Sequence, residues 1–188
     1  MAISIGTVRL NIGSGDLPMR MPGWVNVDRA PYTGVDLVLT VPPLPWESGT
    51  VSEIYAGHFL EHLTREAGAE FLRECYRVLQ PGGRVGILVP DMAECFRRYV
   101  ADEPAPAEFP AGHHRDLRDL DDLNEMIIFS TAQPSHHLWS YDFVTLRRAL
   151  ERAGFMGIQD FDRFSDPRVA TGQWYQFGLD AFKPPVET

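Results

Sequence analysis

A glycine-containing turn followed by an acid is the first arrangement of residues that could bind a ligand. The run LNIGSGD at 10–16 has the pattern of a strand entering a glycine turn, and VNVD at 25–28 places Asp28 at the end of the next strand. Glycine lacks a β-carbon, so its backbone amides can approach a ligand closely, and a carboxylate at the neighbouring strand end can accept both hydroxyls of a ribose. A plain tight turn is the alternative interpretation of the two glycines.

The spacing within this arrangement distinguishes between nucleotides. The dinucleotide fingerprint needs a third glycine that opens a helix and an acid about 20 residues further on. Pro18 stands where the third glycine would fall, and Asp28 follows Gly15 by only 13 residues. A nicotinamide dinucleotide is therefore disfavoured.

Titratable side chains form a second group of candidates. His58 and His62 are four residues apart in the run AGHFLEHL at 56–63, a spacing that could serve one metal on a helix, and Glu61 accompanies them. No third ligand stands at a recognisable distance in the sequence, so we expect no metal site. Asp91 ends the run VPD at 89–91, where it is either an acid–base group or the N-cap of the next helix.

A layered α/β fold must position these residues. Short runs of valine, isoleucine and leucine alternate with helical patterns, which is typical of a parallel sheet with helices on its faces. We expect seven strands in one sheet: Thr7–Ile12, Val25–Asp28, Val35–Leu39, Ser52–Ala56, Arg84–Val89, Ile158–Phe164 and Trp174–Phe182.

Two helices are predicted by apolar residues at three- and four-residue spacings. The first runs from about Thr64 to Leu79 and stops at the Pro-Gly-Gly sequence of 81–83. The second has Asp142 as N-cap and ends at Gly154, where a positive φ costs little. Its expected core face consists of Phe143, Leu146, Leu150 and Ala153.

Between the fifth predicted strand and the last helix lies an insertion at about 92–135. It contains a helical stretch at Met92–Val100, a proline-rich segment at Asp102–Pro110 and a predicted helix at His114–Phe129. The insertion is too short to be a domain. We interpret it as a lid over the carboxyl ends of the strands, within a single domain of residues 1–188.

Composition excludes several classes of protein. The 188 residues carry a net charge of -9, and the segment from Asp102 to Glu125 alone contributes -6 of it. Because nucleic-acid affinity depends on basic groups that displace counterions, and we find no basic patch, we expect no nucleic-acid partner. No apolar run is long enough to span a membrane and no secretory leader is apparent, while Cys75 and Cys95 sit in apolar-periodic stretches. We expect a cytoplasmic protein without a membrane partner.

Four blocks of sequence together resemble a known family. They are LNIGSGD…PGWVNVD, AGHFLEHL at 56–63, LRECYRVLQPGGRVGILVPD at 72–91 and HHLWSYDFVTLRRALERAGF at 136–155. In this order they are similar to the class I S-adenosylmethionine-dependent methyltransferases, and most to the compact methyltransferase type 11 branch. The resemblance implies a Rossmann-like, mostly parallel sheet of order 3-2-1-4-5-7-6 with the last strand antiparallel. It also implies S-adenosyl-L-methionine as cofactor and S-adenosyl-L-homocysteine as product.

The resemblance assigns roles to individual residues. Gly13 and Gly15 match the glycines that pack against the cofactor, with Asn11 in the same motif, and Asp28 matches the acid that binds the ribose. Ser14 replaces a cysteine that is common between the two glycines. Thr40 stands where many relatives have an aspartate that reaches adenine. The two indoles of Trp24 and Trp46 either line this pocket or belong to the core.

The resemblance also points to groups near the transferred methyl. His58 matches the position beside the methionine part of the cofactor, and His137 matches a histidine that faces the pocket from the lid side or ties the lid down. His58, His137 and Asp91 are the candidate bases, because imidazole titrates near 6.5 and an alcohol acceptor must lose a proton. In the same resemblance, Glu61 and His62 cap the next helix.

The expected function is therefore methyl transfer to a small-molecule or sugar acceptor. A catalytically silent protein that binds the cofactor is the alternative from another class. A nucleic-acid methyltransferase is disfavoured because the residues after Tyr55 are AGHF rather than an Asn/Asp-Pro-Pro-aromatic motif.

Overall fold

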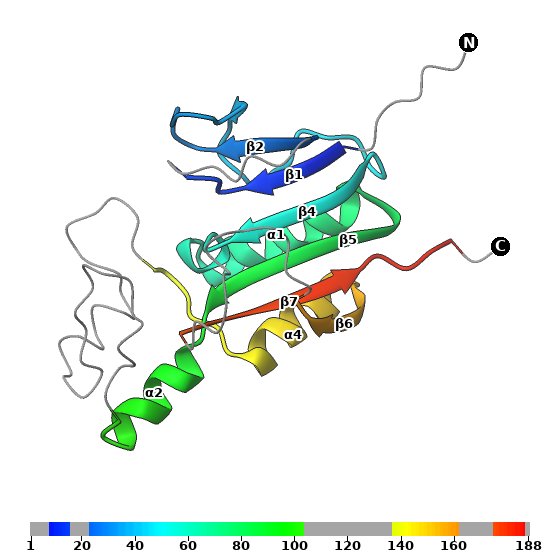
Figure 1. Ribbon diagram of the computed structural model, residues 1–188. Helices are drawn as coiled ribbons and strands as arrows, with labels where there is room; N and C mark the ends of the chain where they lie inside the picture. Colours follow the sequence, from blue (N-terminus) through cyan, green and yellow to red (C-terminus); the bar gives the residue numbers. More distant parts are fainter. Residues whose placement is uncertain (1–7, 16–22, 104–136, 162–174, 187–188) are drawn as a thin grey trace, which may run out of the picture.

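The computed structural model describes residues 8–15, 23–103, 137–161 and 175–186, which form one sheet with helices beside it (Figure 1). The sheet has seven strands in the order β3-β2-β1-β4-β5-β7-β6. β1 to β5 run parallel, and β7 runs antiparallel to β5 and β6, so the predicted fold class and strand order are confirmed. The strands are β1 (Val8–Ile12), β2 (Trp24–Asp28), β3 (Leu37–Val38), β4 (Val51–Gly57), β5 (Leu79–Pro90), β6 (Met156–Asp160) and β7 (Gln176–Phe182).

The registers bring three strand ends together at one edge of the sheet. Ile12 of β1 pairs with Val27 of β2 on one side and with Ala56 of β4 on the other. Because parallel strands end on the same side, the residues that follow β1, β2 and β4 meet there. The glycine turn, Asp28 and His58 are thus neighbours by topology.

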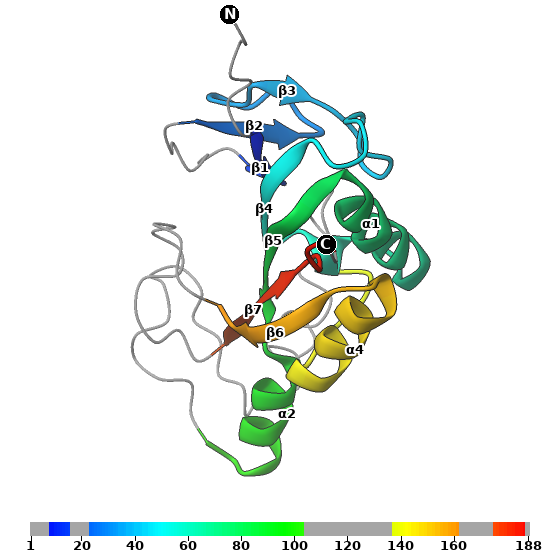
Figure 2. The same ribbon diagram turned by 90° about the vertical axis from the view of Figure 1, so that its right-hand side faces the viewer.

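Helices α1 (Arg65–Val78) and α4 (Phe143–Ala153) lie next to each other on one face of the sheet (Figure 2). Thr64 is the N-cap of α1, and its side chain accepts a hydrogen bond from the Ala67 amide. Asp142 caps α4 in a capping box with Thr145, and Gly154 ends it at φ 102°, as predicted. These caps satisfy backbone groups that would otherwise lack partners.

The core face of α4 is narrower than predicted. Leu146 and Leu150 are fully buried, but Phe143 is 43% exposed. Phe143 lies in the first turn and its ring contacts Phe177 at 6.4 Å between centroids, so it covers the rim of the core instead of entering it.

β5 begins earlier than predicted, whereas α1 ends at Val78, within one residue of the predicted Leu79. Leu79 already pairs with Val51, so the strand starts directly after the helix and not at Arg84. The register shifts between Val51 and Glu53, and Gly82 adopts φ 77° in this irregular part of the strand. Proline has no amide to donate to a ladder, which explains why regular pairing starts only at Arg84.

The predicted helical stretch at Met92–Val100 is α2 (Met92–Val100), with Asp91 as its N-cap, while the lid-like insertion itself stays a prediction. The predicted helix at His114–Phe129 and the rest of the insertion lie outside the described residues, as do Trp174 and the end of the sixth predicted strand. Both Cys75 and Cys95 are buried, and neither is part of a disulfide. No helix in the described ranges has the length and apolar character that crossing a membrane requires.

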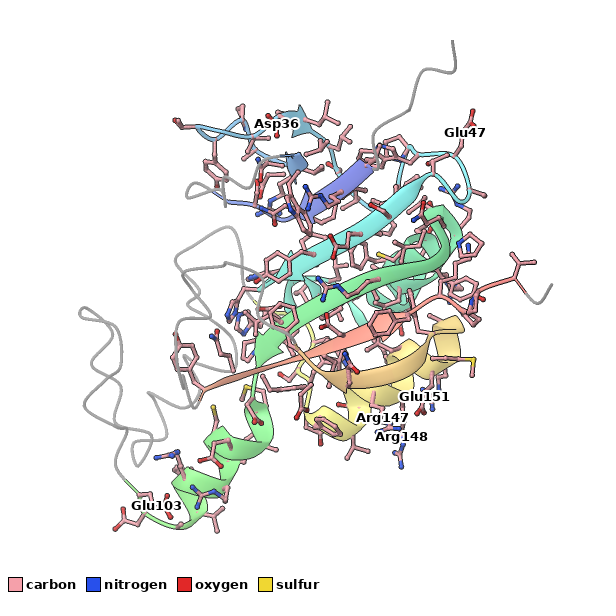
Figure 3. All side chains as sticks on the ribbon, turned by 45° about the vertical axis from the view of Figure 1, so that its right-hand side comes forward. Asp36, Glu47, Glu103, Arg147, Arg148 and Glu151 are labelled. Carbon is pink, nitrogen blue, oxygen red and sulfur yellow. The ribbon has the colours of Figure 1, made fainter. Side chains whose placement is uncertain are left out.

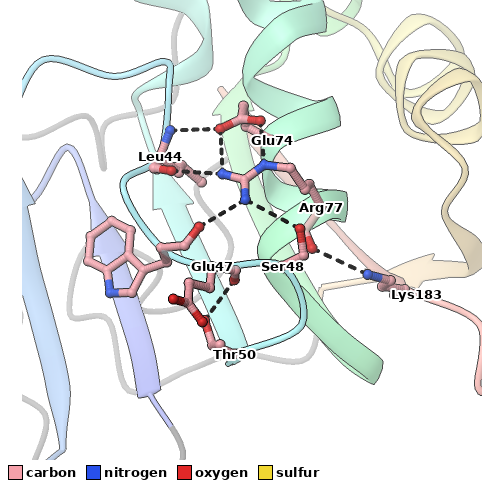
Figure 4. A network of polar contacts seen from close by, with 8 residues as sticks. Leu44, Glu47, Ser48, Thr50, Glu74, Arg77 and Lys183 are labelled. Carbon is pink, nitrogen blue, oxygen red and sulfur yellow. Dashed lines mark hydrogen bonds and ion pairs between the residues drawn. The ribbon is translucent and has the colours of Figure 1, made fainter.

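A polar network fixes the loop between β3 and β4 onto α1 (Figure 4). The Arg77 guanidinium donates to Glu74 at 2.7 Å and to the carbonyl oxygens of Leu44 and Trp46 at 2.8 and 2.9 Å. Glu74 in turn accepts from the Leu44 amide. The hydrogen bond from Arg77 lowers the pKa of Glu74, against the opposing effect of burial.

Candidate functional site

The glycine turn after β1 is tied to the end of β2. Gly13 and Gly15 adopt φ values of 69° and 68°, which favour glycine. The Gly13 amide donates to the Val27 carbonyl at 2.8 Å, and the Gly15 amide donates to Oδ2 of Asp28, also at 2.8 Å. Oδ1 of Asp28 accepts from the Ala30 amide at 3.0 Å. The turn and the acid therefore form one unit.

This unit fits a ribose-bearing cofactor. Each carboxylate oxygen can accept about two hydrogen bonds, so Asp28, which is partly exposed, retains capacity for two hydroxyls. A β-carbon at Gly15 would meet no atom of the described chain within 4 Å. Among the described residues, none fills the space into which a side chain at Gly15 would point.

The other three residues of the motif, Asn11, Gly13 and Ser14, pack within the protein. A β-carbon at Gly13 would lie 2.7 Å from Cδ2 of Phe59, so this glycine is required by packing. Asn11 is buried, and its Nδ2 donates to Asn26 at 2.9 Å, which links β1 to β2. Ser14 is buried as well, and its Oγ has no hydrogen-bond partner within the described residues. Their direct contact with the cofactor stays a prediction.

Of the residues that could line the adenine pocket, Thr40 lies on the surface and the two tryptophans pack in the core. Thr40 follows β3 and is exposed, and its adenine contact stays a prediction. Trp24 is buried in a small cluster with Tyr55 and Leu88, and Trp46 packs against the main core. For the two indoles, the core interpretation is the one the structure favours.

His58 occupies a strained position directly after β4. Its φ is 52°, which is uncommon for a residue with a side chain, and its amide donates to the Leu88 carbonyl at 2.9 Å. Nδ1 lies 3.1 Å from Oε1 of Glu61, and Nε2 lies 2.6 Å from Oε1 of Gln176. The ring is thus held from both sides, by the residue three positions later and by β7.

Glu61 is a buried carboxylate surrounded by histidines. Burial alone would raise the pKa of Glu61, but its hydrogen bond with His58 and the neighbouring rings of His62 and His137 outweigh that effect. Its pKa therefore lies below the ordinary value, and the group is ionised at neutral pH. Sequence reasoning missed this role, although an acid among the apolar residues of AGHFLEHL was a signal of it.

His137 reaches the same cluster from the other end of the chain. Its ring packs edge to face on His62 with centroids 5.0 Å apart. The Leu138 and Trp139 amides donate to the Glu61 carbonyl at 2.8 and 3.2 Å, which fixes this part of the chain. Both predicted histidine bases, His58 and His137, therefore converge on Glu61.

Two interpretations of this segment are corrected. Thr64, and not Glu61 or His62, caps α1. The set of possible metal ligands also differs from the one weighed in the sequence, His58 and His62 with Glu61, because donor atoms of Glu61, His62 and His137 lie within 4.8 Å of one another. Sequence spacing could not reveal the proximity of His137, which comes from a distant segment. That the protein binds no metal stays a prediction, which metal analysis tests.

Asp91 is the N-cap of α2, and its Oδ1 accepts from the Glu94 amide at 3.1 Å. Burial raises the pKa of Asp91, although the hydrogen bond from the Glu94 backbone opposes the shift. Asp91 is therefore the helix N-cap, which is one of the two roles that the sequence suggests. A catalytic role for Asp91 stays a prediction.

Comparison with known proteins supports the fold described above. A family model described as a methyltransferase domain matches residues 22–87, whereas no curated protein matches the chain. An S-adenosylmethionine-dependent methyltransferase from Archaeoglobus fulgidus has a TM-score of 0.56 at 14% identity, over 94% of this chain and 86% of that one. A possible histamine N-methyltransferase from Thermotoga maritima has a TM-score of 0.56 at 15% identity, over 93% and 81%.

A third solved structure contains the cofactor. It is phosphoethanolamine N-methyltransferase 2 from Haemonchus contortus, in complex with S-adenosyl-L-methionine, with a TM-score of 0.53 at 13% identity. The similarity covers 97% of this chain and 50% of the Haemonchus chain. The resemblance found in the sequence is thereby confirmed: the chain has the fold of the class I S-adenosylmethionine-dependent methyltransferases and matches a methyltransferase-domain model over residues 22–87, and S-adenosylmethionine is the cofactor of this group.

Proposed function

We propose that this protein transfers a methyl group from S-adenosylmethionine to a hydroxyl of a small-molecule or sugar acceptor. The observation that carries the proposal is the pair of His58 and Glu61 after β4, with Nδ1 of the ring 3.1 Å from a buried carboxylate oxygen. A buried acid behind an imidazole is the arrangement that a general base requires.

In the proposed reaction, this chain holds the cofactor and removes one proton. Asp28 accepts the ribose hydroxyls, and the open backbone at Gly15 leaves room for the sugar. The bound cofactor supplies a methyl group already activated on positively charged sulfur, so alignment of the acceptor is the main requirement. The remaining step for the protein is to take the hydroxyl proton.

Glu61 determines which ring atom can take that proton. With Nδ1–H donated to the carboxylate, Nε2 of His58 is the nitrogen left to act as the base. The atom 2.6 Å from Nε2 is Oε1 of Gln176, which can only accept a hydrogen bond, so Gln176 must move away or turn its amide NH2 toward the ring before Nε2 takes a proton. An acceptor hydroxyl that replaces Gln176 as the partner of Nε2 would transfer its proton there. The ionised Glu61 then stabilises the imidazolium, and the product ether leaves with the former proton on His58.

His137 supports this pair in the proposal. It contacts His62 and contributes to the lowered pKa of Glu61. A base role for His137 predicts a loss of turnover in His137→Gln, whereas a positioning role predicts an effect mainly on the Michaelis constant. The two roles are therefore separable.

The test is turnover with a panel of hydroxylated metabolites and sugars, measured as S-adenosylhomocysteine formed. His58→Gln keeps a hydrogen-bonding group but cannot take a proton at neutral pH, so we expect turnover at saturating cofactor to fall by about 10²–10⁴. Affinity for S-adenosylhomocysteine, measured separately, reports any lost contact between His58 and the methionine part. A fully active His58→Gln would overturn the base assignment. Turnover is also measured after treatment with a chelator, and the purified protein is analysed for metal. Unchanged turnover without bound metal is expected if no metal takes part.

The second candidate function is a catalytically silent protein that binds the cofactor. The observation that favours it is the occupied Nε2 of His58, since Gln176 already lies at hydrogen-bond distance. Gln176→Ala separates the two candidates. It should lower the Michaelis constant or raise turnover if Gln176 yields to an acceptor, whereas tight cofactor binding with no turnover in any variant or acceptor would favour the silent protein.

A further inference from the structure

A pocket of about 300 Å³ lies between α1 and α4, away from the glycine turn. Arg65 and Arg73 enter it from α1, and Arg148 and Arg152 enter it from α4. Trp139 and Tyr141 line the end of the pocket that adjoins Glu61. Four guanidinium groups in one pocket are unexpected in a chain of net charge -9.

The periodicity of the two helices explains how the pocket forms. Arg65, Ala69 and Arg73 follow one another at four-residue spacing on α1, and Arg148 and Arg152 do so on α4. Residues four apart share one helix face, so each helix turns a row of arginines toward the other. Ala149 and Ala153 lie in the same pocket, where small side chains leave the space between the helices open.

These arginines differ from the others on the two helices. Arg77 pairs with Glu74 (Figure 4), and Arg147 pairs with Glu151 at 3.0 Å. Figure 3 labels Arg147 and Glu151 together with the pocket residue Arg148. Within the described residues, no carboxylate forms an ion pair with any of the four pocket arginines. The four arginines are exposed, so solvent screens their mutual repulsion, but no acid of the described chain neutralises them and an anion that binds between them meets no competing carboxylate.

The pocket is also partly preorganised. The Arg65 guanidinium lies over the Trp139 ring at 5.5 Å, and the Trp139 amide is fixed on the Glu61 carbonyl at 3.2 Å. Tyr141 is almost fully buried, and its hydroxyl oxygen would lie 3.0 Å from a β-carbon at Gly68, so this ring forms a fixed wall of the pocket against α1. Planar guanidinium forks and an aromatic face are suited to a phosphate that carries an organic group.

We propose that this pocket binds a phosphate-bearing small molecule, with the four arginines on its phosphate or diphosphate and Trp139 against its organic part. The concave shape and the volume correspond to the lower end of small-molecule sites. A long polyanion is a poorer fit, because Glu66, Glu70 and Glu151 flank the arginine rows on the same helices. The site is separate from the Asp28 unit and does not depend on the proposed methyl transfer.

The test is calorimetric titration of the full chain with inorganic phosphate and with diphosphate at low salt. We expect binding in the micromolar range for diphosphate, weaker for phosphate, and falling with added salt. Arg148→Gln combined with Arg152→Gln should weaken diphosphate binding by at least tenfold. Arg147→Gln is the matched control, since it lies on the same helix but pairs with Glu151, and it should change the affinity less than twofold.

Thermal unfolding is a second test, which also shows whether each variant is folded. Removal of repelling charges should leave the melting temperature of the ligand-free double variant equal to or above that of the wild type. Diphosphate should raise the melting temperature of the wild type and of Arg147→Gln only. Equal stabilisation of all three proteins, no binding to the wild type, or tighter binding of a single-stranded oligonucleotide than of diphosphate would each overturn the proposal.

Discussion

At the scale of single residues, Gly15 offers the cleanest test of the cofactor site because the chain contains its control. Gly15 and Gly49 have φ values of 68° and 76°, and a β-carbon at either would meet no described atom within 4 Å. Alanine should therefore cost similar strain at both positions, about 1 kcal/mol. Only Gly15→Ala should also weaken S-adenosylhomocysteine binding, by tenfold or more, as measured by calorimetry. Equal affinities of the two variants would remove Gly15 from the site.

Asp28 should contribute through charge-assisted hydrogen bonds to the ribose. Each such bond is worth about 1.5–3 kcal/mol, so Asp28→Ala should weaken S-adenosylhomocysteine binding by tenfold or more. Because the same carboxylate accepts from the Gly15 and Ala30 amides, the variant should also be less stable. Asp160→Asn, on an exposed position of β6, is the control for the loss of one acid. Unchanged affinity in Asp28→Ala would show that the strand-end assignment is wrong.

The sequence predicts these residue-level features because they are local. A glycine turn and an acid at adjacent strand ends are encoded within about 20 residues, and parallel pairing brings them together. Gln176 lies 118 positions from His58, and nothing in its surrounding sequence marks it as a partner of that ring. The contact of His137 with His62 likewise depends on how the chain returns to the sheet.

At the scale of elements, the network on α1 should make stability depend on pH. Glu74 has a lowered pKa in the folded protein because Arg77 donates to it. A carboxyl with a depressed folded pKa stabilises the native state above its unfolded pKa, here about 4.5, and loses that contribution as the pH falls through the folded value. Glu74→Gln should therefore destabilise by about 1–2 kcal/mol at pH 7 and much less near pH 3, by chemical denaturation. Glu151→Gln, in an exposed pair, should cost under about 0.5 kcal/mol at either pH.

Element boundaries show where sequence patterns mislead. The helix predicted to end at Leu79 ends at Val78, but the strand predicted to start at Arg84 already starts at Leu79, which pairs with Val51. Tertiary pairing thus extends the strand through the Pro-Gly-Gly sequence of 81–83. Phe143 has the spacing of a core residue on α4 but lies at the rim, since periodicity defines a face and not how far the core extends along it.

At the scale of the whole molecule, a net count of charges conceals their arrangement. The sequence predicts no basic patch, because the four pocket arginines are spread between positions 65 and 152. Two helices that pack side by side bring them into one pocket (Figure 2). Long-range packing cannot be derived from the spacing of residues in one sequence. Here it brings scattered basic residues together into a local positive field within an acidic protein.

This arrangement leads to a prediction about nucleic acids. The total of -9 repels a phosphate backbone, and a pocket with room for about one or two phosphates releases few counterions, so it cannot replace an extended basic surface. We expect no binding of a 20-nucleotide single-stranded RNA or DNA at micromolar protein and about 150 mM salt, by fluorescence anisotropy, while diphosphate still binds.

At about 20 mM salt any oligonucleotide binding should be weak and should disappear in Arg148→Gln/Arg152→Gln, but not in Arg147→Gln. Tight binding with a steep salt dependence that survives the double substitution would reveal a nucleic-acid surface elsewhere on the chain and would restore the nucleic-acid methyltransferase that the sequence disfavours.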